Sequence, residues 1–214
     1  MAGDTERAVT IPADGVELDG DLTVPPDASG LVVFAHGSGS SRKSPRNTFV
    51  ADELDGRGLG TLLFDLLTET EDRDRANRFD IPLLTDRLLA ATDWVADDAA
   101  TAVLPPGYFG ASTGAAAALR AAARRGDDVG AVVSRGGRVD MAEEALPQVT
   151  APSLFVVGSE DTDVLELNRE AYDRLTCEKE LAVVEGAGHL FEGPGQLETV
   201  ADLAGDWFVD HLTE

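Results

Sequence analysis

Several kinds of residue are scarce in this sequence. A single cysteine, Cys177, stands among 214 residues, so the chain cannot form an internal disulfide. No apolar run is long enough to cross a bilayer, and residues 1–7 lack the basic region and apolar stretch of a secretory signal. Together these absences predict a cytoplasmic protein with no membrane partner.

Basic residues are also few. The 17 lysines and arginines face 40 aspartates and glutamates, which gives a formal net charge of -23, and Lys43 and Lys179 are the only lysines. Because a field of this sign repels phosphate backbones, we expect no nucleic acid partner. Self-repulsion of this size is tolerated where salt screens it, with a Debye length of about 3 Å at 1 M. We therefore expect a halophilic source, and an acidic protein of an ordinary cytoplasm is the alternative.

Residues that bind metals or nucleotides are scarce as well. Three histidines and one cysteine offer no metal-ligand cluster. The glycine-rich loop at residues 36–42 lacks the spacings G-x-x-x-x-G-K-[ST] and G-x-G-x-x-G that cradle phosphates and dinucleotides. We expect neither a metal nor a cofactor.

The pattern of apolar residues indicates one domain over residues 1–214, since no linker rich in proline, glycine or serine divides the chain. Alternating apolar and polar residues on both sides of Asp14 and Gly15 predict an antiparallel hairpin from residues 7–11 and 16–24. Short apolar runs predict strands buried on both faces at residues 31–35, 61–65, 108–110, 129–133, 153–157 and 181–184. Helical periodicity covers residues 47–57, 82–97, 112–125, 165–175 and 196–212.

This alternation predicts an α/β fold, a mostly parallel eight-stranded sheet with an antiparallel N-terminal edge hairpin and helices on both faces. Residues 68–80 are dense in charge and are expected to form a solvated loop without a chemical role. In such a sheet the reactive groups gather in loops at the carboxyl ends of the strands.

Ser112 lies in such a loop. It is the centre of Gly110-Ala111-Ser112-Thr113-Gly114, which fits G-x-S-x-G between an apolar run and an alanine-rich helix. A serine in a sharp strand-to-helix turn is exposed as a nucleophile, and the residues two before and two after it must be small. The sequence therefore predicts Ser112 as a catalytic nucleophile.

Residues 36–42, which follow the 31–35 strand, have the composition of an oxyanion hole. Their glycines let backbone N–H groups converge on an anionic oxygen. We expect the donors to be the amides of Ser38 and Thr113, the residue after the nucleophile. A phosphate-binding loop is the alternative, and His36 is expected to shape the loop rather than act as a base.

His189 follows the last predicted strand and is the candidate general base, because a serine hydroxyl needs a base of near-neutral pKa. His211, at the end of the last helix, is expected to face solvent or cap that helix. Asp161 is the candidate acid that orients His189, with Glu160 and Asp163 as alternatives. We expect Val164 to begin the following helix.

The order Ser112, Asp161, His189 is that of one particular fold. With the segments H-G-S-G-S-S-R, F-G-A-S-T-G-A, S-R-G-G-R, V-G-S-E-D-T-D-V-L-E-L-N and G-A-G-H-L-F-E, the chain resembles an α/β-hydrolase of the dienelactone hydrolase-like branch. The resemblance covers residues 16–212 and implies Ser112 as nucleophile, Asp161 as acid and His189 as base. Dienelactone hydrolases proper carry a cysteine nucleophile, whereas this chain has Ser112 at that position. Cys177 is expected to be a small buried residue.

The loops around this site suggest the substrate. Only residues 134–151 separate two predicted strands where larger hydrolases insert a cap, so we expect no substantial cap domain and an open site. Five basic residues fall in residues 42–46 and 135–138, and we expect Arg42 and Arg135 to bind an anionic substrate. Pairing of these arginines with nearby acids is the alternative.

The sequence thus predicts a serine hydrolase that acts on a small ester, lactone or thioester through an acyl-enzyme intermediate. Acyl transfer or perhydrolysis at the same triad is one alternative. A domain of this fold that binds a ligand or partner without turnover is another. The substrate partner is expected to be a small molecule, and the sequence leaves the oligomeric state open.

Overall fold

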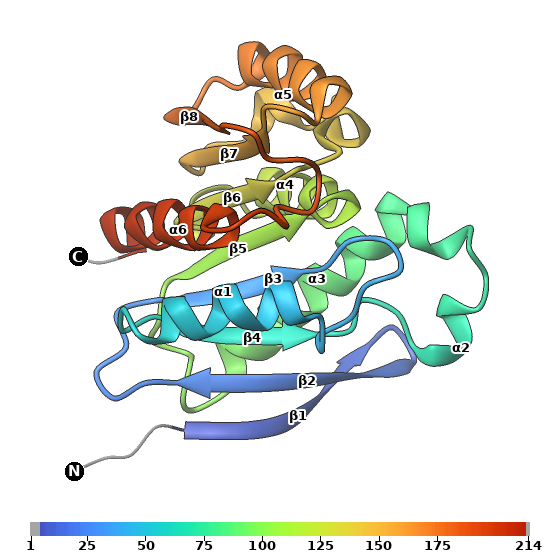
Figure 1. Cartoon of the computed structure of the whole chain (residues 1–214). Coiled ribbons are helices and arrows are strands. Elements are labelled where there is room, and N and C mark those ends of the chain that lie inside the picture. The colour runs from blue at the N-terminus through green and yellow to red at the C-terminus, as the bar shows by residue number, and fades with distance from the viewer. Residues whose placement is uncertain (1–4, 213–214) are drawn as a thin grey trace.

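The computed structural model describes residues 5–212, which form one eight-stranded sheet with helices on both faces (Figure 1). The strands are β1 (Thr5–Ala13), β2 (Val16–Val24), β3 (Leu31–Ala35), β4 (Gly60–Phe64), β5 (Pro106–Ala111), β6 (Ala131–Arg135), β7 (Ser153–Gly158) and β8 (Lys179–Val184). The helices are α1 (Pro45–Asp55), α2 (Glu69–Asp72), α3 (Ile81–Asp97), α4 (Thr113–Arg125), α5 (Thr162–Arg174) and α6 (Gln196–Leu212). Short 3-10 turns are η1 (Asn77–Phe79), η2 (Gly126–Asp128), η3 (Val139–Ala142) and η4 (Leu146–Gln148).

The strands lie in the order β1-β2-β4-β3-β5-β6-β7-β8. β1 and β2 pair antiparallel across a turn in which Asp14 and Gly15 both have positive φ, at 46° and 81°. β2 is antiparallel to β4, and every later neighbour pair is parallel. The mostly parallel sheet with an antiparallel edge hairpin is therefore confirmed.

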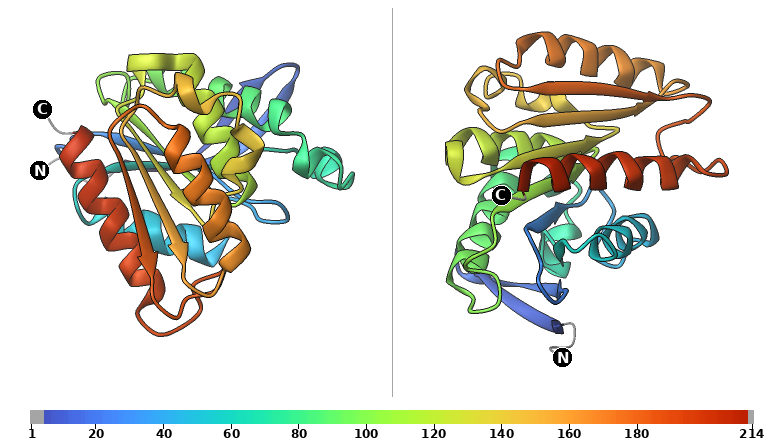
Figure 2. Two further views of the ribbon diagram at one scale, coloured as in Figure 1. Left: turned by 90° about the horizontal axis from the view of Figure 1, so that it is seen from above. Right: turned by 90° about the vertical axis from the view of Figure 1, so that its left-hand side faces the viewer.

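The core lies in two layers, one on each face of the sheet. One layer packs α3, α4 and part of α5 against the sheet, and the other packs α1 and α6 against its opposite face (Figures 1 and 2). β3 and β6 are buried along their whole length because both of their faces are covered. A fully buried Val, Leu or Phe contributes about 1.5–3 kcal/mol, so these central strands form a rigid support for the loops that follow them.

The edge position of β8 changes one expectation about burial. β8 was predicted as a strand buried on both faces, but it has only β7 beside it, and its Val183 is 44% exposed. Apolar content cannot distinguish an edge strand from a central one. The predicted strand and helix positions are otherwise matched to within a few residues, except that α5 begins at Thr162 rather than at Val164.

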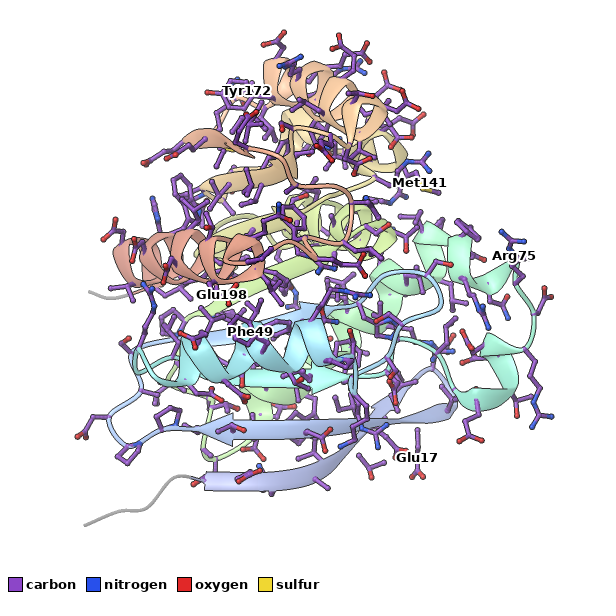
Figure 3. The ribbon with its side chains drawn as sticks, in the orientation of Figure 1. Glu17, Phe49, Arg75, Met141, Tyr172 and Glu198 are labelled. Carbon is purple, nitrogen blue, oxygen red and sulfur yellow. The ribbon has the colours of Figure 1, made fainter. Side chains whose placement is uncertain are left out.

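Residues 68–80, predicted as a solvated loop, are all exposed or half-buried, but they are not a simple loop. They contain α2 and η1, and Thr68 and Glu71 form a reciprocal capping box at the start of α2. The Arg78 guanidinium donates to the Asp72 carboxylate through Nε and Nη2, each at 2.8 Å, while Arg75 projects into solvent (Figure 3). Glu71, Asp72 and Arg78 are thus held in ion pairs, whereas the remaining charged residues of the segment form none within residues 5–212.

The connection between β6 and β7 contains only η3 and η4, both packed against α4 and α5. No cap covers the carboxyl ends of the strands from this connection, as the sequence predicts. Among residues 5–212 no helix is both long and apolar enough to cross a membrane.

Candidate active site

Ser112 stands in the turn between β5 and α4 in a strained backbone conformation. Its φ is 51° and its ψ is -118°, a region that a residue with a side chain rarely adopts. The Ser112 amide donates to the Arg135 carbonyl oxygen at 3.2 Å, and the Arg138 amide donates to the Ser112 carbonyl oxygen at 3.0 Å. These bonds to the β6 end hold the turn in a shape that lifts the Ser112 hydroxyl above the sheet.

The glycines on either side of Ser112 are required by close backbone approach. A Cβ on Gly114 would lie 2.0 Å from the Ala35 carbonyl oxygen, and one on Gly110 would lie 2.5 Å from the Ala115 Cα. No side chain fits at either position without moving strand or helix backbone. The steric reason for the G-x-S-x-G pattern is therefore present here.

His189 and Asp161 are brought together from two different loops. The His189 Nδ1 lies 2.6 Å from the Asp161 Oδ2. Asp161 occupies the N-cap position of α5, but its side chain makes no cap bond to that helix. An ionised carboxylate accepts the Nδ1 proton, which leaves Nε2 as the acceptor on the imidazole. Gly136 lies beside the ring, since a Cβ there would be 3.4 Å from His189 Nδ1.

The two alternative acids do not reach the imidazole. Glu160 and Asp163 are exposed, and no hydrogen bond or ion pair to His189 is formed by either among the described residues. Asp161 is thus the carboxylate that the structure brings to His189. Ser112 and His189 line the same cavity, and no hydrogen bond joins them within residues 5–212.

The loop at residues 36–42 lies beside the nucleophile, with one difference from expectation. The Ser38 amide donates to Thr113 Oγ1 at 2.9 Å, so it is already occupied, whereas the Thr113 amide at the start of α4 has no acceptor in the described chain. A Cβ on Gly37 would lie 3.0 Å from the Ser112 Cβ, which shows how close this loop comes. Of the two expected oxyanion donors, Thr113 is free in this structure and Ser38 would first have to release the threonine hydroxyl.

His36 fixes the shape of this loop. Its Nδ1 lies 3.0 Å from the Gly37 carbonyl oxygen, and its Nε2 accepts the Leu66 amide proton at 3.0 Å. These contacts require the neutral Nδ1–H tautomer, and burial lowers the pKa of His36. His36 therefore has the structural role that the sequence indicates.

A cavity of about 620 Å³ surrounds the proposed nucleophile and base. Two smaller cavities do not contain Ser112. One, of about 380 Å³, lies over β1, β2 and α1, and the other, of about 360 Å³, lies beside residues 65–72. The cavity of Ser112 is lined by Gly37, Ser38, Gly39, Ser40, Ser41, Lys43, Ser44, Pro45, Arg46, Asp72, Ser112, Arg135, His189 and Leu190. Its position at the carboxyl ends of β3, β5 and β6 is that expected of a site in this kind of sheet.

The two predicted substrate-binding arginines have different environments. Arg42 is absent from the lining of this cavity, and its guanidinium is held by Asp65 and Asp21. Arg42 is therefore paired with acids, which was the alternative to substrate binding. Arg135 lines the cavity and is only 8% exposed.

Arg135 has no acidic partner. Its Nε and Nη1 are enclosed without a hydrogen-bond acceptor, and burial, followed by the nearby charge of Arg46, lowers the pKa of Arg135 to about 10. Composition indicated a basic loop here, but only the fold reveals that this guanidinium is buried and unpaired.

Arg46, one of the basic residues expected near the site, lines this cavity, whereas Asp72 was not expected there. Asp72 comes from the charged segment that was expected to have no chemical role.

The described residues contain no group of three or more His, Cys, Asp or Glu that could hold a metal ion. Cys177 is half-buried with its Sγ 3.9 Å from Ser153 Oγ, and burial raises the pKa of its thiol.

No protein-family profile matches the chain. Its structure superimposes with a TM-score of 0.96 on that of a dienelactone hydrolase from Anabaena variabilis ATCC 29413, at 51% identity over 99% of this chain and 100% of that one. Est1E from Butyrivibrio proteoclasticus shares the fold, with a TM-score of 0.81 and 18% identity over 95% of this chain and 98% of its own.

Two curated relatives come from Mycobacterium tuberculosis, strains CDC 1551 / Oshkosh and ATCC 25618 / H37Rv. Each is 57% identical over 207 residues, which is 97% of this chain and 47% of the relative, and both are provisionally named phosphoribosyl transferases. The chain thus spans about half the length of the curated relatives that it matches.

Proposed function

Because this chain belongs to the dienelactone hydrolase-like branch of the α/β-hydrolases, we propose that it is a serine hydrolase of small esters, lactones or thioesters. The observation that supports this most directly is the 2.6 Å contact between His189 Nδ1 and Asp161 Oδ2, beside the cavity that also contains Ser112. A binding domain has no need of a strained serine, an oriented imidazole and a glycine loop in one place.

In the proposed reaction the Ser112 hydroxyl attacks the carbonyl carbon while His189 Nε2 takes its proton. The Thr113 amide stabilises the oxyanion, and the Ser38 amide joins it once the Thr113 side chain rotates and its hydroxyl no longer accepts that proton. The imidazolium then protonates the leaving alcohol or thiol, which departs from the acyl-enzyme. Water, deprotonated by His189, adds to the acyl carbon and releases the acid, so that Ser112 regains its proton.

The cavity favours small and anionic substrates. It is open, without a cap over it, so a long acyl chain would find little apolar cover. Arg135 and Arg46 give it a positive wall in a chain of net charge -23. The name phosphoribosyl transferase belongs to proteins of which this chain matches less than half, and we do not carry that activity over.

Fluorophosphonate labelling tests this proposal. We expect the wild type to be labelled and Ser112→Ala to be unlabelled. Asp161→Asn should lower kcat for p-nitrophenyl acetate by roughly 10³–10⁴-fold, because the imidazole loses the carboxylate that orients it. Asp163→Asn, which removes an exposed carboxylate of the same loop, is the matched control and should retain activity.

An unlabelled wild type would instead favour a binding domain. Labelling with product formed only when a second alcohol or peroxide is supplied would favour acyl transfer or perhydrolysis.

A further inference from the structure

Arg135 is exceptional among the buried arginines of the described chain. Arg87, the other one, donates to the Ala13 carbonyl oxygen and to the Glu71 carboxylate. Arg135 forms no ion pair and no side-chain hydrogen bond within residues 5–212, although it is 8% exposed. A buried charge without a partner is strongly unfavourable, so its presence calls for a partner that is not part of this chain.

The surroundings of Arg135 add positive charge rather than neutralise it. Arg46 is close enough to lower the pKa of Arg135, and its own contact with an acid is the long 3.9 Å approach to Glu192. Asp72, an acid in the lining of the cavity, is engaged by Arg78. Although the chain has 40 acidic residues, none within residues 5–212 forms an ion pair with Arg135.

The N-terminus of α1 opens into the same cavity. This 11-residue helix begins at Pro45, and its N-cap residue Ser44 makes no side-chain cap bond. The amides of Arg46 and Asn47 have no acceptor among residues 5–212, and Ser44, Pro45 and Arg46 all line the cavity. A helix N-terminus carries a partial positive charge and free N–H groups, which are suited to an anion.

The available donors favour a phosphate over a carboxylate. Nε and Nη1 of Arg135 are enclosed, which leaves Nη2 as the nitrogen that can reach a ligand. A planar carboxylate prefers two parallel hydrogen bonds from two nitrogens of one guanidinium, and Arg135 does not offer this pair. The remaining donors come from a different element, the α1 N-terminus and Arg46. A tetrahedral phosphate has three terminal oxygens that can reach donors lying in different directions, whereas a carboxylate has two in one plane.

We propose that this cavity contains a subsite for a phosphate group, formed by Arg135, Arg46 and the N-terminus of α1. Ser112 shares the cavity, and its amide is bonded to the Arg135 carbonyl oxygen, so the phosphate and the scissile carbonyl belong to one molecule. The substrate class is an ester, lactone or thioester that bears a phosphate group. This assignment of substrate rests on the proposed hydrolase function, whereas phosphate binding itself does not require turnover.

Binding of inorganic phosphate tests the subsite. Titrations at constant ionic strength use Ser112→Ala as the parent, so that no catalysis is needed, with Arg135→Met, Arg46→Met and Arg124→Met each added to it. Arg124 is an exposed arginine of α4 paired with Asp86, outside the cavity, and is the matched control. We expect Arg135→Met and Arg46→Met each to weaken phosphate binding at least tenfold and Arg124→Met to leave it unchanged. Circular dichroism checks the fold, and Arg46, which is only half-buried, keeps the test decisive should Arg135→Met unfold.

Two results would overturn the subsite: no phosphate binding by the parent, or equal binding by all variants. Tighter binding of acetate than of phosphate would also overturn it, since it would identify a carboxylate site. Failure of the hydrolase function is detected separately, as absence of fluorophosphonate labelling in the wild type.

Discussion

Replacing Ser112 by glycine should make the protein more stable while it removes the proposed nucleophile. The φ of 51° and ψ of -118° are accessible to glycine but strained for serine, at a cost of about 1–3 kcal/mol. Glycine also gains about 0.5–1 kcal/mol of entropy in the unfolded chain, which opposes folding. The Ser112 side chain makes no cap bond to α4, so none is lost. The difference between these two contributions is about 0–2.5 kcal/mol, and we expect a net gain in the free energy of unfolding near its middle, about 1 kcal/mol.

Urea denaturation of the wild type, Ser112→Gly and Ser112→Ala at one salt concentration measures this gain. Alanine keeps the Cβ and therefore the strain, so Ser112→Ala should unfold within about 0.5 kcal/mol of the wild type. Both variants should be inactive. Should Ser112→Gly prove no more stable than Ser112→Ala, the turn would hold no strain and the reasoning would be refuted.

Two other predictions concern packing and charge. Gly114→Ala should destabilise the fold by about 3 kcal/mol or more, because its Cβ would meet the Ala35 carbonyl oxygen at 2.0 Å. Gly56→Ala, with φ of -61° and nearest neighbours at 3.5 Å, is the control and should be neutral or stabilising in the same urea assay. Because of the net charge of -23, the midpoint of urea unfolding should rise steeply between low salt and 2 M KCl, and a flat salt dependence would contradict the expected halophilic adaptation.

The positions of the central strands could be predicted because they are short, apolar and separated by amphipathic helices. β3 and β6 have continuous apolar runs, and the structure buries every residue in both. The order of chemical groups along the chain then located the site, since loops at the carboxyl ends of parallel strands meet at one edge. Asp161 could be chosen only as one of three acids, because a one-residue shift in the start of α5 changes which carboxylate faces His189.

The roles of the two arginines could not be predicted from the sequence. Arg42 and Arg135 both lie in basic loops that follow strands of the sheet. Arg42 meets Asp21 on β2 and Asp65 after β4, elements distant in sequence, and its charge is neutralised there. Arg135 lines the cavity of Ser112, and no carboxylate of residues 5–212 pairs with it. Such differences arise from tertiary contacts, which neither composition nor periodicity encodes.

The state of the Ser38 amide is a further example. The spacing to the preceding strand indicates which amide lies near the nucleophile, but not which acceptor it finds. Here the Thr113 hydroxyl, one residue after Ser112, accepts that proton at 2.9 Å. Rotation of the Thr113 side chain would therefore free the Ser38 amide to donate to another acceptor.

The charged segment at residues 68–80 is solvated, as its charge predicts, but it also contains short helices and reaches the site. Arg78 pairs with Asp72 within the segment, and Glu71 pairs with Arg87 of α3. Asp72 lines the cavity of Ser112, and a Cβ on Gly39 would lie 3.7 Å from Arg78 Nη1. Because Gly39 belongs to the same loop as Ser38, this loop lies against the ion pair of Asp72 and Arg78. In so acidic a chain, the pairing of Asp72 with Arg78 also reduces the repulsion between this carboxylate and the phosphate-bearing substrate that we propose.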